Sequence, residues 1–464
     1  MNLFLVVVVL GGWMVAHADA GRNPPNVVLI FADDLGFGDL GCYGAKGYRT
    51  PHLDRLARGG VILKRHVVPQ AVCSASRAAL LTGCYPNRVG ILGALGPGSK
   101  TGIHEEEITM AEILKQRGYA TAVLGKWHLG DHPRFSPLRH GFDEYYGLPY
   151  SNDMWPRHPT GTYPDLPLME GEKVVALNPD QSRLTGEYTD RAIRFMETHR
   201  ARPFFIYLAH SMPHVPLFAG EGFRGRTKRG LFGDVLEEVD HSVGRMVEAL
   251  ERLGLRKHTL VIFTSDNGPW LSYGDHAGWA PGLREGKGTT FEGGVRVPCI
   301  VSCPGVLPKG KKIWHWVSSM DWFPTVAARA GAVLSPGRIL DGRDLWPILT
   351  GKAGGDPGRE AFAYYWGKEL QAIRVGDWKL HFPHAYLKPM PPGRGGKPGT
   401  LRTQRQERAL YHLKEDPAER KNLIDQRPDM ANRLEEAAVR VRRDLGDSLT
   451  GEVGRGVRPA GRLD

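Results

Sequence analysis

The chain has 464 residues, of which 41% are hydrophobic and 24% are charged, proportions typical of a globular protein and not of a disordered one. The formal net charge of +11 suits a polyanionic partner, although a basic solvated surface explains it equally well. The sequence has no helix-turn-helix, zinc-finger or RNA-binding signature, so nucleic acid is disfavoured as a partner.

The first 20 residues predict a secretory signal peptide. An apolar core over residues 3–15 is followed by Ala-Asp-Ala at residues 18–20, a small-residue pattern that precedes cleavage sites. No later stretch is apolar enough for a membrane span. We therefore expect a protein exported to the periplasm, the extracellular space or a lysosome, with a mature chain that starts near Gly21.

Predicted strands and helices alternate along the next three hundred residues. The strands are expected at residues 26–32, 61–68, 119–124, 203–209 and 259–264. The helices are expected at residues 50–58, 109–117, 186–199 and 231–253, and a capping box begins the second of them at Thr109. Residues 152–184 show no regular period and are expected to form a surface excursion. The alternation favours an α/β fold with a mostly parallel sheet covered on both faces.

The first strand, residues 26–32, is an apolar run typical of a strand buried on both faces, and Asp33 and Asp34 follow directly at its end. Two neighbouring carboxylates in such a place are costly unless a cation neutralises them. A helix cap or an Asx turn is the alternative explanation. The pattern favours a metal site.

Residues 69–83 form the second distinctive segment. Cys73 precedes a run with strong helix propensity, which Gly83 closes. The cysteine is therefore expected at or one turn before a helix N-terminus, where free N–H groups and the helix dipole favour an anion. Arg77, one turn further on, adds a positive charge. Taken by itself, Cys73 is either a thiolate nucleophile of lowered pKa or a buried structural cysteine, and the local pattern leaves both open.

Polar side chains also follow three later strands, at the edge of an open α/β sheet where ligands bind. They are Lys126 and His128, His210 and His214, and Asp266 and Asn267. If the strands that end at residues 33–34 and 266–267 converge, three carboxylates and one amide would suit Ca²⁺ or Mg²⁺ and not zinc. Separate local caps are the alternative. Lys287 is flanked by glycines and can approach an anion closely.

The character of the sequence changes after about residue 340. Residues 372–375 and 378–382 predict a hairpin, residues 409–413 a strand and residues 429–445 an amphipathic helix. Residues 388–408 are expected to form a basic surface loop rich in proline and glycine. The predicted organisation is a signal peptide (1–20), a catalytic domain (21–340), an α+β subdomain (341–445) and a mobile tail (446–464).

Five cysteines in a chain of this length do not form a disulfide scaffold. If Cys73 is modified, the other four are left to pair. They are Cys42, Cys84, Cys299 and Cys303. The last two are close enough in sequence to form a bridge, but the sequence does not decide the pairing.

Several of these segments, in this order, resemble motifs of the type I sulfatases. Residues 73–77 read Cys-Ser-Ala-Ser-Arg and continue as Ala-Ala-Leu-Leu-Thr-Gly, similar to the signature in which the cysteine is converted to formylglycine. The other matching segments are Phe-Ala-Asp-Asp-Leu-Gly, Gly-Lys-Trp-His-Leu-Gly, Thr-Ser-Asp-Asn-Gly and Gly-Lys-Gly-Thr-Thr-Phe-Glu-Gly-Gly. The similarity is to the arylsulfatase-type and N-acetylgalactosamine-6-sulfatase-like members and covers nearly all of the mature chain.

The resemblance implies a fold and an activity. The implied fold is the alkaline-phosphatase-like α/β sandwich, with a large, mostly parallel mixed sheet flanked by helices and a smaller C-terminal domain with an antiparallel sheet. The implied activity is hydrolysis of sulfate monoesters, on a sulfated carbohydrate or an aryl sulfate. A formylglycine-generating enzyme would mature Cys73.

The resemblance also implies a role for each candidate residue. The expected ligands of Ca²⁺, which the family favours over Mg²⁺, are Asp33, Asp34, Asp266 and Asn267, with the modified residue 73 near the metal. Arg77 and His128 would orient the formylglycine hydrate. The residues expected to bind the sulfate oxygens or to serve the leaving group are Lys126, Ser151, His214 and Lys287. His214 is preferred over His210 because a proline follows it two residues on.

Two rival functions remain on the sequence alone. One is a hydrolase of phosphate or phosphonate esters with the same fold, although a phosphatase would normally hold two zinc ions with more His and Asp ligands. The other is a non-catalytic protein that binds polyanions, as the net charge of +11 suggests. The oligomeric state is not predicted.

Overall fold

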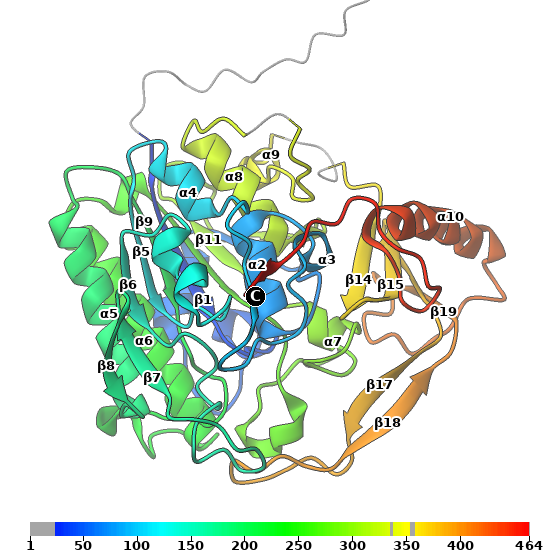
Figure 1. Cartoon of the computed structure of the whole chain (residues 1–464), viewed down its shortest axis with the longest axis horizontal. Coiled ribbons are helices and arrows are strands. Elements are labelled where there is room, and N and C mark those ends of the chain that lie inside the picture. Colours follow the sequence, from blue (N-terminus) through cyan, green and yellow to red (C-terminus); the bar gives the residue numbers. More distant parts are fainter. Residues whose placement is uncertain (1–23, 335–336, 353–357, 464) are drawn as a thin grey trace, which may run out of the picture.

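The computed structural model describes residues 24–334, 337–352 and 358–463 (Figure 1). Its central strand is β1 (Asn26–Ala32), every residue of which is buried. The predicted signal peptide at residues 1–20 lies outside the described residues. In the described part of the chain, no helix has the length and apolar character that a membrane crossing needs.

The large sheet has ten strands, and its central strands are parallel. β1 pairs in parallel with β10 (Thr259–Ser265) and β9 (Phe204–Ala209), and β5 (Ala120–Gly125) pairs in parallel with β9 and with β6 (Glu144–Gly147). The antiparallel strands lie toward the two edges, so the sheet is mixed, as expected. The full order is β12 (Lys311–Ile313), β2 (Val61–Leu63), β11 (Ile300–Ser302), β10, β1, β9, β5, β6, β7 (Pro167–Glu170) and β8 (Lys173–Leu177).

Helices cover both faces of this sheet, and the alternation of side chains along β1 shows why. Val28 and Ile30 belong to one core, which α1 (Pro51–Arg58), α5 (Gln181–Thr198) and α6 (Leu231–Arg252) enclose. Val27, Leu29 and Phe31 belong to the opposite core, which α2 (Cys73–Thr82), α4 (Met110–Lys115) and α8 (Trp322–Arg329) enclose. The sheet therefore needs apolar residues at every position of its central strands.

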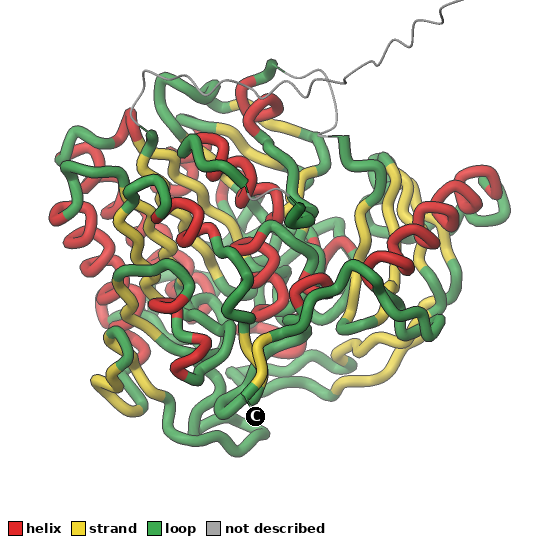
Figure 2. The backbone as a smooth tube through the Cα atoms, turned by 45° about the horizontal axis from the view of Figure 1, so that its top comes forward, coloured by secondary structure: helices red, strands yellow, loops and turns green. Residues whose placement is uncertain are grey.

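A smaller antiparallel sheet follows in the chain and lies to one side of the large one (Figure 2). Its order is β14 (Phe362–Trp366), β15 (Glu369–Val375), β16 (Trp378–His381) and β19 (Ala409–His412). The predicted hairpin is confirmed, because Val375 pairs with Trp378 across a two-residue turn. The predicted C-terminal helix is α10 (Pro428–Leu445), which packs on this sheet.

The remaining elements are short. The helices are α3 (Pro86–Val89), α7 (Glu292–Val295) and α9 (Trp346–Thr350). The strands are β3 (His66–Val67), β4 (Thr101–Gly102), β13 (Val317–Ser318), β17 (His384–Pro389), β18 (Leu401–Gln406) and β20 (Gly461–Arg462). The strand predicted over residues 61–68 is divided into β2 and β3, which belong to different sheets.

Two predicted loops contain regular structure instead. Within residues 152–184, β7 and β8 extend the large sheet, and α5 begins at Gln181 because the side chain of Asp180 accepts a hydrogen bond from the N–H of Ser182. Within residues 388–408, β17 and β18 form a two-stranded antiparallel hairpin. The prediction of irregular structure was wrong in both segments. These strands are short and lack a regular alternation of apolar and polar residues, so they form only by pairing with neighbouring strands.

The segment after residue 446 is not the mobile tail predicted. It returns to the first part of the chain, where β20 pairs with β4 and the N–H of Leu463 donates to the carbonyl of Lys100. Asp447 is buried and binds Arg442, and Arg458 forms an ion pair with Glu107 at 2.7 Å. Arg458 and Glu107 are remote in sequence, as are β20 and β4, so no local pattern indicated these contacts.

All five cysteines lie in the described part of the chain and are free, so no disulfide bond joins them. The bridge considered between Cys299 and Cys303 is ruled out by β11, which lies between them. An extended strand separates residues four positions apart by about 13 Å. A disulfide requires Cα atoms within about 7 Å of each other.

We expect Arg458→Ala to lower the free energy of unfolding by about 1–2 kcal/mol, because it leaves the buried Glu107 with Arg338 as its remaining cation. The measurement is a urea titration followed by fluorescence. Arg455→Ala, at an exposed position of the same segment, serves as the control and should stay within about 0.5 kcal/mol of the parent. Equal stability of the two variants would show that the tail contributes nothing to the fold.

Candidate active site

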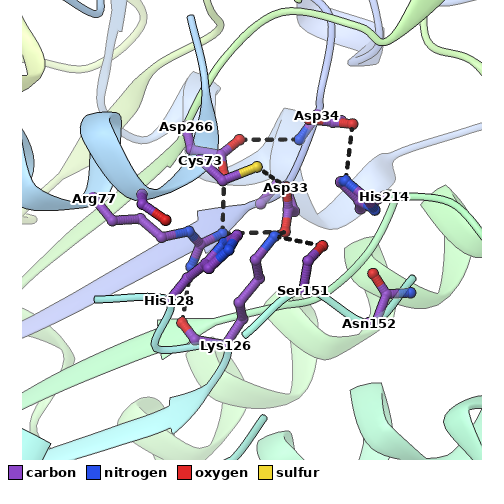
Figure 3. A network of polar contacts seen from close by, with 12 residues as sticks. Asp33, Asp34, Cys73, Arg77, Lys126, His128, Ser151, Asn152, His214 and Asp266 are labelled. Carbon is purple, nitrogen blue, oxygen red and sulfur yellow. Dashed lines mark hydrogen bonds and ion pairs between the residues drawn. The ribbon is translucent and has the colours of Figure 1, made fainter. Parts of the chain in front are cut away.

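The carboxyl ends of the central parallel strands bring the candidate residues to one edge of the sheet (Figure 3). β1 leads to Asp33 and Asp34, β10 to Asp266 and Asn267, and β5 to Lys126 and His128. Asp34 and His128 have φ angles of 61° and 60°, a left-handed conformation that side chains other than glycine seldom adopt. Both strands therefore turn sharply where they deliver their polar residues. Such strain is commonly stored at functional sites.

A fully buried ion network joins these strand ends to α2. Arg77 on α2 lies 2.9 Å from Asp266 and 3.2 Å from Asp33, and also donates to the backbone carbonyl of Lys126 at 2.8 Å. The ammonium of Lys126 lies 2.5 Å from Asp33. Burial alone would raise the pKa of Asp33, but Lys126, His214 and Arg77 outweigh it and hold that pKa well below its usual value. Asp33 is therefore ionised.

Asp34 belongs to a neighbouring group of contacts. The Nζ of Lys287 lies 2.8 Å from its carboxylate, and the amide of Asn267 donates to that carboxylate at 2.7 Å. Lys287 also donates to Nε2 of His214 at 3.0 Å, and that ring lies 3.5 Å from Asp34. Burial works against the charge of Lys287, but Asp34 outweighs it and raises the pKa of the lysine well above its usual value. Lys287 is therefore a permanent cation here.

Cys73 is the first residue of α2, at the helix N-terminus that the sequence predicted. Its Sγ lies 3.7 Å from Asp33 Oδ1, and its side chain lines a pocket of about 460 Å³. Burial raises the pKa of this thiol to about 12, although Lys126 and Lys287 act in the opposite direction. Burial therefore opposes the thiolate of lowered pKa that the sequence left open for the unmodified residue.

His128 is neutral, with one free ring nitrogen. Its Nε2 lies 2.8 Å from the carbonyl of Leu95, which can only accept, so the proton is on Nε2. Nδ1 is buried without a partner among the described residues. Burial first, and then Lys126 and Arg77, lower the pKa of the ring well below its usual value. Nδ1 is therefore available as a base.

The structure also separates the two histidines after β9. His214 lines the pocket, and its Nδ1 donates to the carbonyl of Val215, which leaves Nε2 facing Lys287. His210 lies elsewhere, with its Nε2 3.1 Å from the hydroxyl of Ser242 on α6. The hydroxyl of Ser151 accepts a hydrogen bond from Lys126 at 3.1 Å. The geometry thus brings His214 and Ser151 into the cluster and leaves His210 outside it.

Sequence reasoning missed three further residues of the pocket. Asp153 is buried, and its Oδ1 has no partner within the described chain. Trp270 covers Lys287, with the ammonium 4.3 Å from the centre of the ring, and Trp366 from β14 lines the same pocket. Asp153 follows Ser151 by two residues and could have been noticed. The two tryptophans reach the site only through tertiary folding.

The cluster has the ligand atoms that a hard cation requires. Ligand atoms of Asp33, Asp34, Cys73 and His214 all lie within 4.8 Å of one another. Asp266 lies beside them, where one oxygen accepts from the N–H of Asp34 and the other binds Arg77. The amide oxygen of Asn267 is buried with no partner among the described residues, so it is free to bind a cation. Carboxylate and amide oxygens are the ligands that Ca²⁺ and Mg²⁺ prefer.

Comparison with known proteins agrees with this geometry. A family model described as sulfatase matches residues 25–332, and a second, described as the C-terminal region of aryl-sulfatase, matches residues 357–455. Arylsulfatase A of Bos taurus is 41% identical over 89% of this chain and 86% of its own length. The N-acetylgalactosamine-6-sulfatase of Canis lupus familiaris is 37% identical over 87% of this chain and 82% of its own.

A solved structure leads to the same family. The crystal structure of a sulfatase from Pseudoalteromonas sp. superimposes with a TM-score of 0.79 at 27% identity, covering 91% of each chain. The predicted alkaline-phosphatase-like fold is thereby confirmed, with its large mixed sheet and C-terminal antiparallel sheet.

We expect Arg77→Met to lower the free energy of unfolding by about 3–5 kcal/mol, because it leaves Asp266 without its cation in a fully buried place. Urea titrations in the presence of a chelator measure the loss. Arg183→Met, at an arginine whose side chain is 71% exposed, is the matched control and should change stability by less than about 1 kcal/mol. A loss at Arg77 no larger than at Arg183 would contradict the role given to the buried network.

Proposed function

This chain belongs to the sulfatase family, and we propose that it hydrolyses sulfate monoesters through a formylglycine formed from Cys73 and a Ca²⁺ ion bound beside it. The proposal rests above all on the position of Cys73, at a helix N-terminus, on the wall of a pocket and 3.7 Å from Asp33. A buried thiol with a raised pKa is a poor nucleophile, so conversion to another group gives this position a chemical role.

The proposed ligands of the cation are Asp33, Asp34, Asp266 and Asn267, with Ca²⁺ preferred over Mg²⁺. A bound divalent cation would supply positive charge to the sulfate oxygens and to residue 73. The balance of charges at the site indicates why a further cation is required. Three carboxylates there face three cationic side chains, so an anionic substrate requires additional positive charge.

Four side chains are proposed to bind the sulfate group or to serve the leaving oxygen: Lys126, Ser151, His214 and Lys287. Lys126 and Lys287 supply fixed charge in a buried place, where it acts most strongly on a developing anion. The hydrogen bond from Lys287 Nζ to His214 Nε2 holds a proton near the leaving oxygen. General acid catalysis of this kind typically contributes about 10²–10⁴-fold.

Arg77 and His128 are proposed to orient residue 73. Arg77 fixes the carboxylates of Asp33 and Asp266 behind it, and the free Nδ1 of His128 is placed to take a proton. A hydrated formylglycine supplies two hydroxyl groups on one carbon, one to attack sulfur and one whose deprotonation releases sulfate. Serine supplies only one hydroxyl, so it would allow the first step and not the second.

The proposed substrate, maturation partner, cellular location and domain organisation follow from the same proposal. The substrate is a sulfated carbohydrate or an aryl sulfate, and a formylglycine-generating enzyme is the partner for maturation. We propose that the protein is exported, with its chemistry carried out by the first domain, up to about residue 340, and with a smaller C-terminal domain beyond it.

We expect that co-expression with a formylglycine-generating enzyme converts Cys73, seen as the replacement of its thiol by an aldehyde in the mass of the tryptic peptide. The converted protein should hydrolyse aryl sulfates with kcat/KM well above that for matched aryl phosphates and phosphonates. The reverse preference would favour a phosphate or phosphonate ester hydrolase. Binding of sulfated glycans without any hydrolysis, despite conversion, would favour the non-catalytic binder.

Cys73→Ser should be nearly inactive in turnover and should accumulate a covalent sulfo group, detected by intact mass after incubation with substrate. The loss is expected because the introduced side chain lacks the second hydroxyl. Cys42→Ser, at a half-buried cysteine away from the pocket, is the control and should keep full activity. Ordinary turnover by Cys73→Ser would defeat the mechanism.

Removal of divalent metal with a chelator should abolish activity and lower the melting temperature, and Ca²⁺ should restore both. Asp34→Asn should weaken the Ca²⁺-dependent rise in melting temperature by at least about tenfold in Ca²⁺ concentration, because it removes a charged ligand. Asp190→Asn, at an exposed carboxylate on α5, should respond to Ca²⁺ like the parent. A melting temperature indifferent to Ca²⁺ in the parent would exclude the proposed site.

A further inference from the structure

The outer wall of the active-site pocket comes from the hairpin of β17 and β18, which belongs to the C-terminal part of the chain. Beyond β17, the connecting segment reaches back to the first part, where the N–H groups of Gly393 and Gly399 donate to the carbonyl of Ser272 (Figure 1). The turn end of the hairpin is thus held against the first part of the chain, and its other end continues from β16 and into β19. Its side chains are placed to contact whatever carries the sulfate group.

The face that the hairpin presents to the pocket is largely apolar. In the strand register Leu387 lies opposite Thr403 and Pro389 opposite Leu401, and all four line the pocket. Leu387 is 54% exposed and Leu401 is 46% exposed. When an apolar ligand covers such exposed apolar surface, the surface is removed from water, and this lowers the free energy of the complex.

Two tryptophans complete this wall on the side of the sulfate site. Trp270 lies over Lys287 and 5.4 Å from the ring of His214, measured between ring centres. The ring of Trp366 reaches within 3.6 Å of the place where a Cβ on Gly288 would stand. The pocket therefore changes from charged at its base to aromatic and aliphatic at its mouth. A ligand whose sulfate is buried would lay its body against these rings and leucines.

The charges around the mouth do not fit a second anion. Among the described residues that line the pocket, Lys287 is the one lysine or arginine, and Asp34 already binds it. The basic residues of the hairpin do not face this pocket. Arg402 has no ion pair within the described chain, but it lies between Leu401 and Thr403 on β18, so its side chain points to the opposite face of the hairpin. Lys388 binds Glu285 at 2.9 Å, and Arg405 binds Glu407 at 2.8 Å, and both basic residues line a neighbouring pocket. Asp153 adds a buried carboxylate.

We propose, on the basis of the sulfatase activity proposed above, that the preferred substrate carries a single sulfate on an uncharged body with an extended apolar face, and that the β17–β18 hairpin selects it. Of the two substrate classes considered, this choice is the aryl sulfate or a sulfate of a comparably apolar alcohol. A pocket of about 460 Å³ suits a ligand of this size. A multiply sulfated glycan would bring further anions to a wall that offers them no free cation.

The test uses three aryl sulfates that share a phenolic leaving group and differ in body. They are phenyl sulfate, 2-naphthyl sulfate, and 2-naphthyl sulfate with a sulfonate on the distal ring. For the converted protein we expect kcat/KM to rise from phenyl to naphthyl by about tenfold, the value of burying one additional apolar group of this size. The distal sulfonate should reverse most of that gain.

Variants assign the selectivity to the hairpin. Leu387→Ser with Leu401→Ser should lower the naphthyl-to-phenyl ratio of kcat/KM by about tenfold, mainly through KM. Leu177→Ser, at an exposed leucine on the edge strand β8, is the matched control and should leave the ratio unchanged. All three leucines are exposed, so neither variant should disturb the core. Thermal melting of each variant checks that the fold is retained.

The outcomes separate this inference from the activity on which it rests. No hydrolysis of the three esters or of a disulfated disaccharide by converted protein would overturn both the activity and the substrate preference. Hydrolysis of phenyl sulfate with a ratio that the hairpin variants leave unchanged would overturn the preference alone. A distal sulfonate that accelerates hydrolysis, or a higher kcat/KM for a disulfated disaccharide, would also overturn the preference alone.

Discussion

The constraint on which the rest of this structure depends is the burial of Asp33 and Asp266 at the ends of two adjacent parallel strands. Each carboxylate is fully buried, and Arg77 contacts both. A buried charge without a partner costs several kcal/mol, so helix α2 must dock where Arg77 can reach the two strand ends. Docking α2 in this way places its first residue, Cys73, against Asp33. The position of Cys73, the proposed catalytic residue, is thus a consequence of charge neutralisation in the core.

The parallel arrangement of the central strands allows these charged residues to meet. Their carboxyl ends lie at the same edge, so residues separated by up to 233 positions in the sequence, Asp34 and Asn267, can meet. The cores on both faces of the sheet hold the strands in place, and the backbone turns sharply at Asp34 and His128. Packing on both faces of the large sheet therefore offsets the strain and the buried charge gathered at one edge.

The C-terminal part of the chain contributes in a different way. Lys379 on β16 is fully buried and lies 3.1 Å from Glu292 and 3.0 Å from Glu419. Through Glu292, this cluster links the small sheet to the segment that begins five residues after Lys287. The small sheet thereby helps to fix the backbone that carries this lysine. The same part of the chain supplies the β17–β18 hairpin. The large sheet thus supplies Asp33, Asp34 and Lys126 at its strand ends, whereas much of the apolar wall of the pocket comes from the separate two-stranded hairpin.

The sequence by itself determined the strands that end in polar residues and the helix that begins at Cys73, because buried apolar runs and capping residues are local signals. β1 matches its predicted bounds, and the motifs that resemble sulfatases indicated the family correctly. It did not determine β7, β8, β17 or the return of Arg458 to Glu107, because short strands and remote ion pairs depend on partners far along the chain. Only the tertiary structure decided that Asp33 lies near Asp266 and that Trp270 and Leu387 line the same pocket. The members of each pair are far apart in the sequence and come close only when the chain folds.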